Sequence, residues 1–528
     1  MKPRPSIHDA GSGRGALTRA EWKSLKGLRL QRLVNDSRLV RRGDTFVAYP
    51  GRSRDGRDYI GQAIAKGAAS VLWERAGSAW NPQWRVPNVG LRGLRRHAGV
   101  IASRVHGAPS RRLMMIGVTG TNGKTTCSQW IAQALTRAGR PCAVIGTLGH
   151  GLGTRLQPLV NTTPDALWLH EQLAAFARRG ARAVAMEVSS IGLDQDRLAG
   201  VEFNTALFTN LTRDHLEYHR TMRAYREAKA ALFAWDTLEH AVVNLDDDFG
   251  AELARRIRRP GLNVIGYGFE AATARGARRV AGANLVTGAH GVAFDAKTPW
   301  GAARVESAAL GRHNAYNLLG TLTVLLASGV ALRKAVAALA ALKPVAGRLE
   351  RLGGGPKPLV VVDYAHTPDA LEQVLLTLRD LLSGPEFRVS SSELKAKGQG
   401  SQSPKPDTRN PKLICVFGCG GDRDRGKRPL MGEVAAKLAD RVVVTSDNPR
   451  GEDPHGIIRE IMAGARRRAN EVLIDADRRR AIVRAVSEAR RGDVVLVAGK
   501  GHEEYQEIRG IRHRFSDAAV AKEALAQL

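Results

Sequence analysis

Residues 113–138 read LMMIGVTGTNGKTTCSQWIAQALTRA, and this stretch decides the fold. An apolar run, residues 113–118, leads into the segment GTNGKTT, residues 120–126, and a helical pattern follows. A strand, a glycine-rich turn and a helix in this order cradle the phosphates of a nucleotide, because backbone N–H groups and the helix dipole point at the anion. We therefore expect Lys124 to reach the β- and γ-phosphates and the Thr125 hydroxyl to ligate Mg²⁺.

The spacing of this segment departs at one position from the common phosphate-loop pattern G-x-x-x-x-G-K-[ST]. Val118 stands where that pattern has its first glycine, and the glycine that is present, Gly120, lies three residues before Gly123. The alternative is an ordinary glycine turn between a strand and a helix. Such a turn requires neither a lysine nor two threonines in register, so the pattern favours a phosphate loop.

Length and charge narrow the possible functions. The chain has 528 residues, enough for roughly three domains, and its 43% apolar content is that of a globular protein. Its net charge of +30 raises nucleic acid or a membrane surface as a partner. However, the excess arginines are scattered, and no basic tail with interleaved aromatic residues occurs in the sequence. We interpret the charge as a solvated surface that attracts anionic substrates, and we expect no nucleic-acid partner.

The cysteines and the apolar runs indicate where the protein works. The four cysteines, Cys127, Cys142, Cys415 and Cys419, form no C-x-x-C pair and lack a zinc-type spacing, which favours buried thiols in a reducing compartment. No apolar run approaches ~20 residues, and the N-terminus has no apolar signal region. We expect a cytoplasmic, monomeric protein without membrane insertion.

Apolar runs that alternate with helical patterns predict three α/β domains. Residues 1–27 are expected to be disordered, and the domains are expected at residues 28–109, 110–343 and 344–528. In the central domain this alternation predicts a mostly parallel sheet with helices on both faces. Residues 383–411, rich in Ser, Lys, Gln, Gly and Pro, are predicted to form a disordered insertion in the third domain.

Polar clusters follow the predicted strands at their carboxyl ends, where open α/β sheets bind ligands. In the central domain these clusters are EVSS, residues 187–190, and TNLTRDH, residues 209–215. The third domain has four of them: DYAH, residues 363–366; GCGGDR, residues 418–423; DNPR, residues 447–450; and GKGHE, residues 499–503. Chance turn chemistry does not supply so many, although a solvated strand-end side chain is the alternative for Glu187 and for His215.

Together these clusters resemble the motifs of the Mur ligase family along nearly the whole chain from about residue 28. The matching stretches are GTNGKTT (120–126), NTTPDA (161–166), EVSSIGLDQDR (187–197), FTNLTRDHLEYH (208–219), YREAKAALF (225–233), GRHNAYNLL (311–319), GRLE (347–350), DYAHTPDAL (363–371), GCGGDRDRGKRPLMG (418–432), SDNPRGEDP (446–454) and AGKGHEEYQ (498–506). The resemblance implies a three-domain α/β architecture. In that architecture an N-terminal UDP-binding domain and a Rossmann-like C-terminal domain flank a central phosphate-loop domain.

The resemblance also implies the reaction. An ATP-dependent, Mg²⁺-dependent ligase would phosphorylate the D-glutamate side-chain carboxylate of UDP-N-acetylmuramoyl-L-Ala-D-Glu. The acyl phosphate would then be attacked by the amine of meso-2,6-diaminopimelate, in peptidoglycan precursor synthesis. Positioning, Mg²⁺ and fixed positive groups would carry such a catalysis, because charge builds up on the transferring phosphoryl oxygens.

Family roles carry over to the matching positions of this chain. The catalytic residues implied are Lys124, Glu187, His215 and a carbamylated Lys229, and Thr125 would join the last three around Mg²⁺. The ATP-binding residues implied are Gly120, Thr121, Asn122, Gly123, Lys124, Thr125, Thr126, His313, Asn314, Arg348 and Asp363. The residues implied for the UDP-sugar peptide are Ser37, Arg52, Ser53, Arg54, Asn161, Thr162, Thr163, Ser189, Gln195 and Arg197. Without the resemblance, Lys229 would be interpreted as a solvated helix residue.

The string DNPR indicates the amino acid that is added. Arg450 can clamp the distal carboxylate of diaminopimelate in a two-pronged fork, which a lysine substrate lacks. An unpaired arginine in a closed site is costly, so lysine should be rejected. The residues implied for the acceptor are Arg423, Asp447, Asn448, Pro449, Arg450, Gly499 and Glu503. One departure from the family pattern is Ile191, which stands where a histidine is expected.

Three alternatives remain open from the sequence. Two lie within the class of ATP-dependent amide ligases: an enzyme that adds L-lysine, and a folylpolyglutamate synthase. The matches to the UDP-binding positions and Arg450 argue against both. The third is a basic nucleotide-binding module that acts on nucleic acid. The net charge of +30 supports it, but it leaves the clusters of the third domain unexplained.

Overall fold

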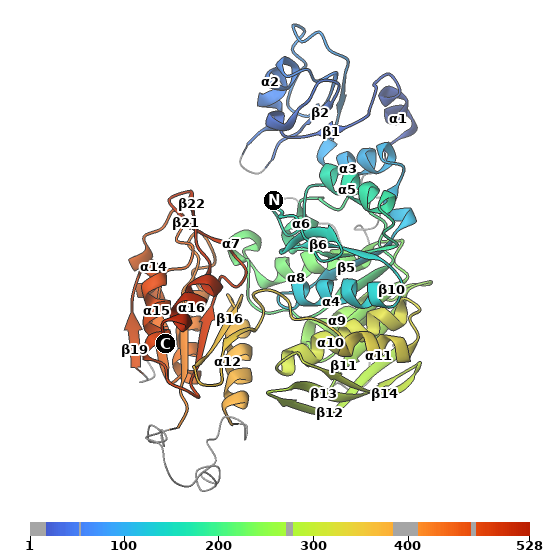
Figure 1. Cartoon of the computed structure of the whole chain (residues 1–528). Helices are drawn as coiled ribbons and strands as arrows, with labels where there is room; N and C mark the ends of the chain where they lie inside the picture. Colours follow the sequence, from blue (N-terminus) through green and yellow to red (C-terminus); the bar gives the residue numbers. More distant parts are fainter. Residues whose placement is uncertain (1–16, 52–53, 271–277, 384–409, 466–470) are drawn as a thin grey trace, which may run out of the picture.

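The computed structural model describes residues 17–51, 54–270, 278–383, 410–465 and 471–528. Three α/β domains follow one another along the chain, and Figure 1 shows them as the blue, the cyan-to-yellow and the orange-to-red parts of the ribbon. In this view the N-terminal domain lies above the central domain, and the C-terminal domain lies beside it. This arrangement confirms the predicted three-domain α/β fold.

The N-terminal domain is built on a four-stranded parallel sheet with the order β1-β2-β3-β4. Its strands are β1 (Leu33–Val34), β2 (Thr45–Ala48), β3 (Ser70–Glu74) and β4 (Asn88–Leu91). Its helices are α1 (Arg19–Leu25), α2 (Ile60–Ala65) and α3 (Leu94–Val105), with short 3₁₀ turns at Ser37–Leu39, Gly56–Tyr59 and Pro109–Arg112. Every residue of β2 and β3 is buried, as expected for parallel strands whose two faces are covered.

The prediction that residues 1–27 are disordered is wrong for its last part. Helix α1 occupies Arg19–Leu25, and it begins with a capping box in which Thr18 and Glu21 satisfy each other's backbone N–H groups. Leu17 and Leu25 are buried against the N-terminal domain, and these apolar contacts stabilise the helix. The mostly polar sequence of this segment does not indicate them. Residues 1–16 lie outside the described part of the chain.

The central domain contains a ten-stranded sheet with the order β14-β13-β12-β11-β10-β9-β5-β8-β6-β7. Its strands are β5 (Met114–Thr119), β6 (Cys142–Gly146), β7 (Gly149–Leu152), β8 (Ala183–Glu187), β9 (Thr205–Phe208), β10 (His240–Asn244), β11 (Asn263–Gly268), β12 (Arg278–Gly288), β13 (Gly291–Thr298) and β14 (Gly301–Ser307). Its helices are α4 (Lys124–Arg137), α5 (Ala166–Arg178), α6 (Ser190–Asp194), α7 (Leu216–His219), α8 (Met222–Ala230), α9 (Asp248–Arg256), α10 (Arg312–Ala327) and α11 (Leu332–Ala340), and a 3₁₀ turn spans Ala231–Ala234. The seven strands from β12 to β6 are parallel, whereas β7 pairs antiparallel with β6, β13 with β12, and β14 with β13.

Alternation along β5 divides the central core into two layers. Ile116 and Val118 pack with α4, α10 and α11 on one face, whereas Met115 packs with α5 and α9 on the other. The predicted sheet with helices on both faces is therefore present. Val118 is fully buried in this core, which explains why a bulky residue replaces the first glycine of the phosphate-loop pattern.

The C-terminal domain has a six-stranded sheet with the order β15-β16-β20-β17-β18-β19, parallel except for the edge strand β15. Its strands are β15 (Glu350–Gly353), β16 (Leu359–Asp363), β17 (Leu413–Phe417), β18 (Arg441–Val444), β19 (Glu471–Ile474) and β20 (Val494–Ala498), and β21 (Tyr505–Ile508) pairs with β22 (Ile511–Arg514) in a hairpin. Its helices are α12 (Pro368–Ser383), α13 (Lys427–Leu438), α14 (Pro454–Ala465), α15 (Arg478–Glu488) and α16 (Asp517–Ala526). Helices α12, α13 and α14 cover one face of the sheet, and α15 and α16 cover the other.

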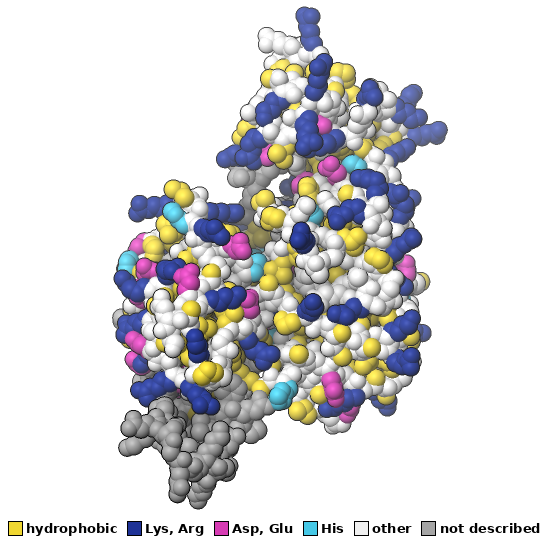
Figure 2. Space-filling view, viewed as in Figure 1, with side chains coloured by type: hydrophobic (Ala, Val, Ile, Leu, Met, Phe, Trp, Pro, Cys, Tyr) yellow, Lys and Arg dark blue, Asp and Glu magenta, His cyan; other side chains and the backbone are white. Residues whose placement is uncertain are grey.

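The predicted insertion at residues 383–411 lies largely outside the described part of the chain, which omits residues 384–409. Ser383 itself ends helix α12. No helix among the described residues is both long and apolar enough to cross a membrane. On the face drawn in Figure 2, Lys and Arg side chains are spread over all three domains rather than gathered into one patch.

Candidate active site

The segment after β5 forms a glycine loop at the point where the order of the central sheet reverses. Strand β5 lies between β8 and β9, so the loops after these three strands meet at one edge of the sheet. Gly123 has a φ of +84° and directly precedes helix α4. A side chain at Gly120 would overlap Thr209, and one at Gly123 would approach Asn317. These two glycines therefore let the loop lie close to its neighbours.

Lys124 is the first residue of helix α4, and its side chain folds back over the loop. Its Nζ atom donates hydrogen bonds to the carbonyl oxygens of Gly120, at 3.0 Å, and Thr121, at 2.8 Å. Burial lowers the pKa of Lys124, while the carboxylates of Glu187 and Asp214 act in the opposite direction. The amine is thus held at the mouth of the loop, where phosphate oxygens would be its alternative acceptors.

Glu187 ends strand β8 as a buried carboxylate directly beside the phosphate loop. The Thr125 hydroxyl donates a hydrogen bond to Glu187 Oε2 over 3.0 Å. The Thr147 N–H donates to Glu187 Oε1 at 2.7 Å, and the Thr147 hydroxyl donates to Oε2 at 3.0 Å. Because Glu187 is only 1% exposed, it is not the solvated strand-end residue that the alternative interpretation requires. Thr147 is not among the site residues predicted from the sequence.

Lys229 lies on helix α8 and reaches the same loop from the other side. Its Nζ atom donates to the Gly120 carbonyl oxygen at 2.6 Å and lies 4.4 Å from the centre of the Tyr225 ring. The side chain is buried, and burial together with the nearby charge of Lys124 holds its pKa well below the ordinary value. Lys229 is therefore not the solvated helix residue that its sequence context alone suggested.

His215 lies at the start of helix α7 with a left-handed backbone, φ +54°. Its ring is 3.4 Å from Asp214 Oδ2 and 3.5 Å from Glu217 Oε1. In the described part of the chain His215 thus pairs with these carboxylates rather than with Glu187. No group of three or more His, Cys, Asp or Glu side chains among the described residues is arranged to hold a metal ion.

The residues predicted at the nucleotide base and ribose lie around the start of α10 and the end of β16. Asn314 donates to the Leu310 carbonyl oxygen at 2.8 Å and accepts from Asn317 at 3.1 Å. His313 has a buried Nδ1 atom without a hydrogen-bond partner among the described residues, and burial lowers its pKa to about 4. Asp363 is buried and accepts the Leu349 N–H at 2.8 Å.

Arg348 brings the C-terminal domain to the phosphate loop. Its Nη2 atom donates to the Thr125 hydroxyl at 3.2 Å, and its guanidinium lies 4.6 Å from the centre of the Tyr364 ring. Its Nε atom is buried and has no hydrogen-bond partner among the described residues. A buried donor without a partner is costly, so this atom indicates a place for an acceptor.

The residues predicted to hold the peptide form one hydrogen-bonded network around Thr163. The Thr163 hydroxyl donates to the Glu187 carbonyl oxygen at 2.9 Å and accepts the Ser189 N–H at 2.9 Å. Arg197 donates to the Thr163 carbonyl oxygen at 2.7 Å and to Gln195 Oε1 at 2.7 Å. The Thr162 hydroxyl lies 3.1 Å from that of Thr147. The peptide network is therefore tied to the carboxylate beside the phosphate loop.

The remaining predicted substrate residues lie outside this network. Asn161 is exposed. In the N-terminal domain, Ser37 is buried and its hydroxyl donates to Gln62 at 2.6 Å. Arg54 is exposed, and Arg52 and Ser53 lie outside the described residues. Ile191, the departure from the family pattern, is half-buried on helix α6.

The predicted acceptor residues follow strands β17, β18 and β20, whose carboxyl ends share one edge of the C-terminal sheet. Asn448 Nδ2 donates to Glu503 Oε2 at 2.8 Å. The Arg450 guanidinium donates to the Gly421 carbonyl oxygen at 2.8 Å, and the Arg450 backbone N–H donates to the Glu507 carbonyl oxygen. A side chain at Gly499 would approach Asp447, and Arg423 is exposed. Asn448 and Glu503 are thus in contact although 55 residues separate them.

One lysine and one arginine that support this edge are not among the site residues predicted from the sequence. Lys500 has a fully buried amine that donates to Asn448 Oδ1 at 3.0 Å and to Glu503 Oε2 at 2.9 Å. Arg478 is also buried and donates to the Ser446 carbonyl oxygen at 3.3 Å and the Ala498 carbonyl oxygen at 2.9 Å, next to the two loops. Lys500 lies inside the motif AGKGHE, which could have indicated it. Arg478 belongs to an ordinary basic cluster that carries no such signal.

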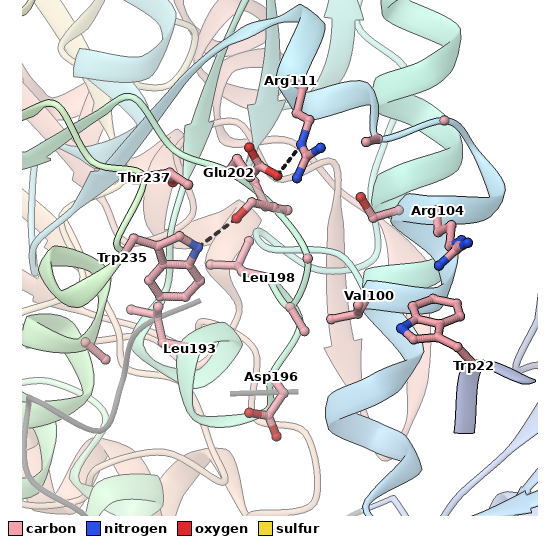
Figure 3. A pocket seen from close by; sticks show the side chains of 17 residues that line it. Trp22, Val100, Arg104, Arg111, Leu193, Asp196, Leu198, Glu202, Trp235 and Thr237 are labelled. Atoms are coloured by element: carbon pink, nitrogen blue, oxygen red, sulfur yellow. Dashed lines mark hydrogen bonds and ion pairs between the residues drawn. The ribbon is translucent and has the colours of Figure 1, made fainter. Parts of the chain in front are cut away.

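A cavity of about 710 Å³ lies apart from these residues, between helix α3 and residues 193–202. Figure 3 shows Trp22 and Trp235 on opposite sides of it and the ion pair between Arg111 and Glu202. Residues 193–202 also carry Gln195 and Arg197, but neither lines the cavity. The lining of this cavity therefore contains neither residues of the peptide network nor any of the predicted catalytic residues.

Comparisons with known proteins agree with this geometry. Three family models match the chain: "Mur ligase family, catalytic domain" at residues 30–106, "Mur ligase middle domain" at residues 118–325, and "Mur ligase, glutamate ligase domain" at residues 401–501. The chain is 48% identical over 506 residues to a UDP-N-acetylmuramoyl-L-alanyl-D-glutamate--2,6-diaminopimelate ligase of Nitrosomonas europaea, covering 95% of this chain and 94% of that protein. It is 49% identical over 500 residues to the protein of the same name from Chromobacterium violaceum, covering 94% and 95%. A solved structure of a ligase with this name aligns with a TM-score of 0.63 and 36% identity, covering 94% of this chain and 95% of that one.

Proposed function

The chain belongs to the Mur ligase family, and from this premise we propose that it is an ATP-dependent ligase of peptidoglycan precursor synthesis. It adds meso-2,6-diaminopimelate to the D-glutamate side-chain carboxylate of UDP-N-acetylmuramoyl-L-Ala-D-Glu. Relatives that match at 48% and 49% identity over nearly their whole length bear the name of this activity. The observation that carries the choice of acceptor is Arg450, which follows Asn448 by two residues in the loop after β18 and donates to the Gly421 carbonyl oxygen.

The reaction proceeds in two steps. The D-glutamate carboxylate attacks the γ-phosphorus of ATP, ADP leaves, and an acyl phosphate forms. The amine of diaminopimelate then attacks the acyl carbon and loses a proton, and phosphate leaves with the electrons of the broken bond. Both steps place charge on phosphoryl or acyl oxygens, so fixed positive groups accelerate them. Lys124 at the loop and Arg348, whose Nε has no hydrogen-bond partner among the described residues, are in position to do so.

The residues at the phosphate loop also fit Mg²⁺. This ion prefers oxygen ligands, and the Glu187 carboxylate with the Thr125 hydroxyl beside it is such a donor set. We assign Thr125, Glu187, His215 and Lys229 to this ion, directly or through water. When bound, Mg²⁺ neutralises charge on the phosphate oxygens.

Lys229 suits this assignment only in a modified form, because an ammonium would repel the cation. Its lowered pKa favours the neutral amine, and a neutral amine can add to CO₂. The nitrogen forms a bond to carbon, a proton leaves, and the side chain becomes an anionic carbamate. We propose that Lys229 carries this carbamate in the active protein.

The three domains divide the substrates between them. Residues 28–109 hold the uridine diphosphate end through Ser37 and residues 52–54, and the network around Thr163 holds the muramoyl peptide. Residues 110–343 bind ATP at the loop, with His313 and Asn314 at the adenine. Residues 344–528 hold the acceptor, and Asp363 faces the ribose. Thr163 is buried and hydrogen-bonded to the half-buried Ser189 and Arg197, which supports this assignment, since a rigid network positions a peptide well.

Acceptor selectivity follows from the charges at the C-terminal edge. Arg450 pairs with the distal carboxylate of diaminopimelate, and Glu503 and Asp447 take the distal ammonium. L-Lysine has no second carboxylate and would leave Arg450 without its partner. We propose that the protein acts as a cytoplasmic monomer, which agrees with four buried free thiols among the described residues.

A phosphate-release assay tests the proposal. The protein is given ATP, Mg²⁺ and UDP-N-acetylmuramoyl-L-Ala-D-Glu with meso-diaminopimelate, with L-lysine or with neither. We expect release with diaminopimelate only, and its loss in Arg450→Ala. The matched control Arg459→Ala changes an exposed arginine on helix α14 and should keep wild-type activity. Release with L-lysine that is indifferent to Arg450 would instead identify a lysine-adding ligase, and no release would refute the assignment as a ligase.

A further inference from the structure

Two ion pairs of opposite polarity join the central and C-terminal domains. Arg213 Nε lies 2.8 Å from Asp424 Oδ2 and Arg213 Nη2 lies 3.0 Å from Asp424 Oδ1, so the guanidinium grips the carboxylate with both prongs. The neighbouring residue Asp214 pairs in the reverse sense, because its Oδ1 atom lies 3.6 Å from the Nζ atom of Lys427. Adjacent residues of one domain thus present a cation and an anion to their counterparts in the other.

These pairs are largely removed from water. Asp214, Asp424 and Lys427 are 6%, 7% and 5% exposed, whereas the Arg213 side chain is 41% exposed. Asp214 is also 3.8 Å from His366 of the C-terminal domain and 3.4 Å from His215 of its own domain. Removing the partner of a buried carboxylate leaves an uncompensated charge and strongly destabilises the folded protein. The C-terminal domain therefore supplies charges that Asp214 needs.

Gly426 provides a second, independent observation. Its φ of −65° is accessible to any residue, so backbone freedom does not explain a glycine there. A Cβ atom at this position would overlap the Nη2 atom of Arg213. The Gly426 N–H also donates to Asp424 Oδ1 at 2.9 Å and so helps to hold the carboxylate. The absence of a side chain at Gly426 thus makes room for the arginine of the other domain.

The junction connects the two halves of the proposed site. Asp214 directly precedes His215, which we assign to the metal, and Asp424 directly follows Arg423, which we assign to the acceptor. We propose that Arg213, Asp214, Asp424 and Lys427 form an interdomain lock. In this role they are positioning residues that hold the acceptor loop in register with the phosphate loop for the second step. This inference rests on the proposed function.

The alternation of charge gives the lock its selectivity. In the observed register each cation faces an anion. A displacement that brought Asp214 towards Asp424, or Arg213 towards Lys427, would place like charges together in a partly dry junction, which is costly. The lock thereby rejects neighbouring docked arrangements in which the amine would miss the acyl carbon, and small misplacements of reacting groups cost much rate.

Charge reversal tests the lock in the full-length protein. Arg213→Asp and Asp424→Arg, made singly, should each lower kcat with diaminopimelate by between about threefold and a hundredfold, the range expected for contacting charges. The double variant Arg213→Asp/Asp424→Arg restores the pair and should regain most of the loss. The exposed pair Arg479 and Glu523 serves as the control, and its reversal should change nothing. A double variant as impaired as the two losses combined would overturn the lock.

Gly426→Ala tests the same contact without a change of charge. Alanine fits the backbone at this position, so the variant should fold, but its Cβ displaces Arg213. We expect a loss of kcat similar to that of Arg213→Ala, and no further loss when the two are combined. Additive losses, or an unchanged kcat in Gly426→Ala, would contradict the lock.

A structural readout separates this inference from the proposed function. Because all four cysteines are buried, nitroxide labels can be attached at Arg255→Cys and Arg459→Cys, which are exposed positions in the two domains. The distance distribution between the labels should be narrow in the otherwise unchanged protein. It should broaden in each single reversal and narrow again in the double variant. If the protein releases no phosphate with diaminopimelate but shows this pattern, the proposed function fails while the lock stands. A distance distribution that is the same in the charge-reversed variants as in the unchanged protein would refute the lock and leave the proposed function standing.

Discussion

At the scale of single residues, buried charges next to a loop can prepare it for a ligand. Lys500 is such a group, because its fully buried amine joins Asn448 and Glu503, two residues of the proposed acceptor site. The amine also lies over the Tyr505 ring, 5.4 Å from its centre. Lys500 therefore fixes the positions of both side chains and lowers the negative charge that Glu503 alone would present.

We predict that Lys500→Met raises KM for diaminopimelate by about tenfold or more, since the loss of a charged hydrogen bond costs roughly 1.5–3 kcal/mol. KM for ATP should stay within about twofold, because the hydrogen bonds of the Lys500 amine go to two residues of the acceptor site rather than to the phosphate loop. Steady-state kinetics with each substrate varied in turn measure both values. Lys522→Met, an exposed lysine on α16, is the control. Equal changes in both KM values would mean a general structural loss instead.

A second residue-scale prediction concerns His170, which is fully buried and lies 2.9 Å from the Ala199 carbonyl oxygen. Burial lowers its pKa from 6.5 to about 4. The folded protein thus binds this proton less well than the unfolded chain. Stability from this group is fully present above pH 6.5 and is lost as the pH falls towards 4.

We expect His170→Gln to weaken this pH dependence, because glutamine keeps a donor for Ala199 but does not titrate. Between pH 6.5 and pH 4 the free energy of unfolding should fall less in the variant, by about 3 kcal/mol. Denaturant titrations at several pH values measure this difference. The difference between variant and wild type should be constant above pH 7, and parallel curves over the acidic range would show that His170 is not responsible.

At the scale of elements, one ion pair fixes two helices of the C-terminal domain. Arg478 at the start of α15 and Asp517 at the start of α16 are both fully buried and form a two-pronged pair, at 2.8 and 2.7 Å. The same guanidinium holds the ends of the two strands that lead into DNPR and AGKGHE. The next residue, Arg479, pairs with Glu523, and both of these side chains are more than half exposed.

These neighbouring pairs give a matched comparison. Asp517→Asn leaves a buried guanidinium without its counter-charge, and we predict a loss of about 3–5 kcal/mol in the free energy of unfolding. Glu523→Gln breaks an exposed pair and should cost less than about 1 kcal/mol. Chemical denaturation of both variants measures the losses. A small effect of Asp517→Asn would show that water reaches Arg478 readily.

Element by element, the sequence was most informative where strands are buried on both faces. The continuous apolar runs of residues 183–187 and 413–417 predict two strands, and β8 and β17 have these bounds. Strand β13 escaped notice because its residues alternate between buried and half-buried, and such a pattern has no apolar run. The burial of Arg478 was not predicted, because a cluster of basic residues gives no indication of which arginine is buried. The motif match directed attention to Lys229, whereas its burial follows only from the packing of α8 against the phosphate loop.

At the scale of the whole molecule, the chain carries a net charge of +30. On the face that Figure 2 draws, the basic side chains are distributed over all three domains rather than gathered into one patch. A field of this kind raises the encounter rate with any anion and is screened by salt over about 10 Å at 0.1 M. ATP and UDP-N-acetylmuramoyl-L-Ala-D-Glu are polyanions, whereas diaminopimelate carries two positive and two negative groups.

This difference makes ionic strength a test with an internal control. As the salt concentration rises from about 20 mM to about 200 mM, kcat/KM for the two anionic substrates should fall several-fold, because screening removes their long-range attraction to the protein. The value for diaminopimelate, whose net charge is zero, should change by less than about twofold, since its binding depends on short-range pairs within the acceptor site. Steady-state kinetics at constant pH, with each substrate varied at saturating levels of the others, give the three slopes. Equal slopes would show that salt acts on the protein itself, and flat slopes for the anions would mean that the scattered arginines contribute no steering. A salt-sensitive shift of DNA without any ligase turnover would instead favour a nucleic-acid partner for this charge.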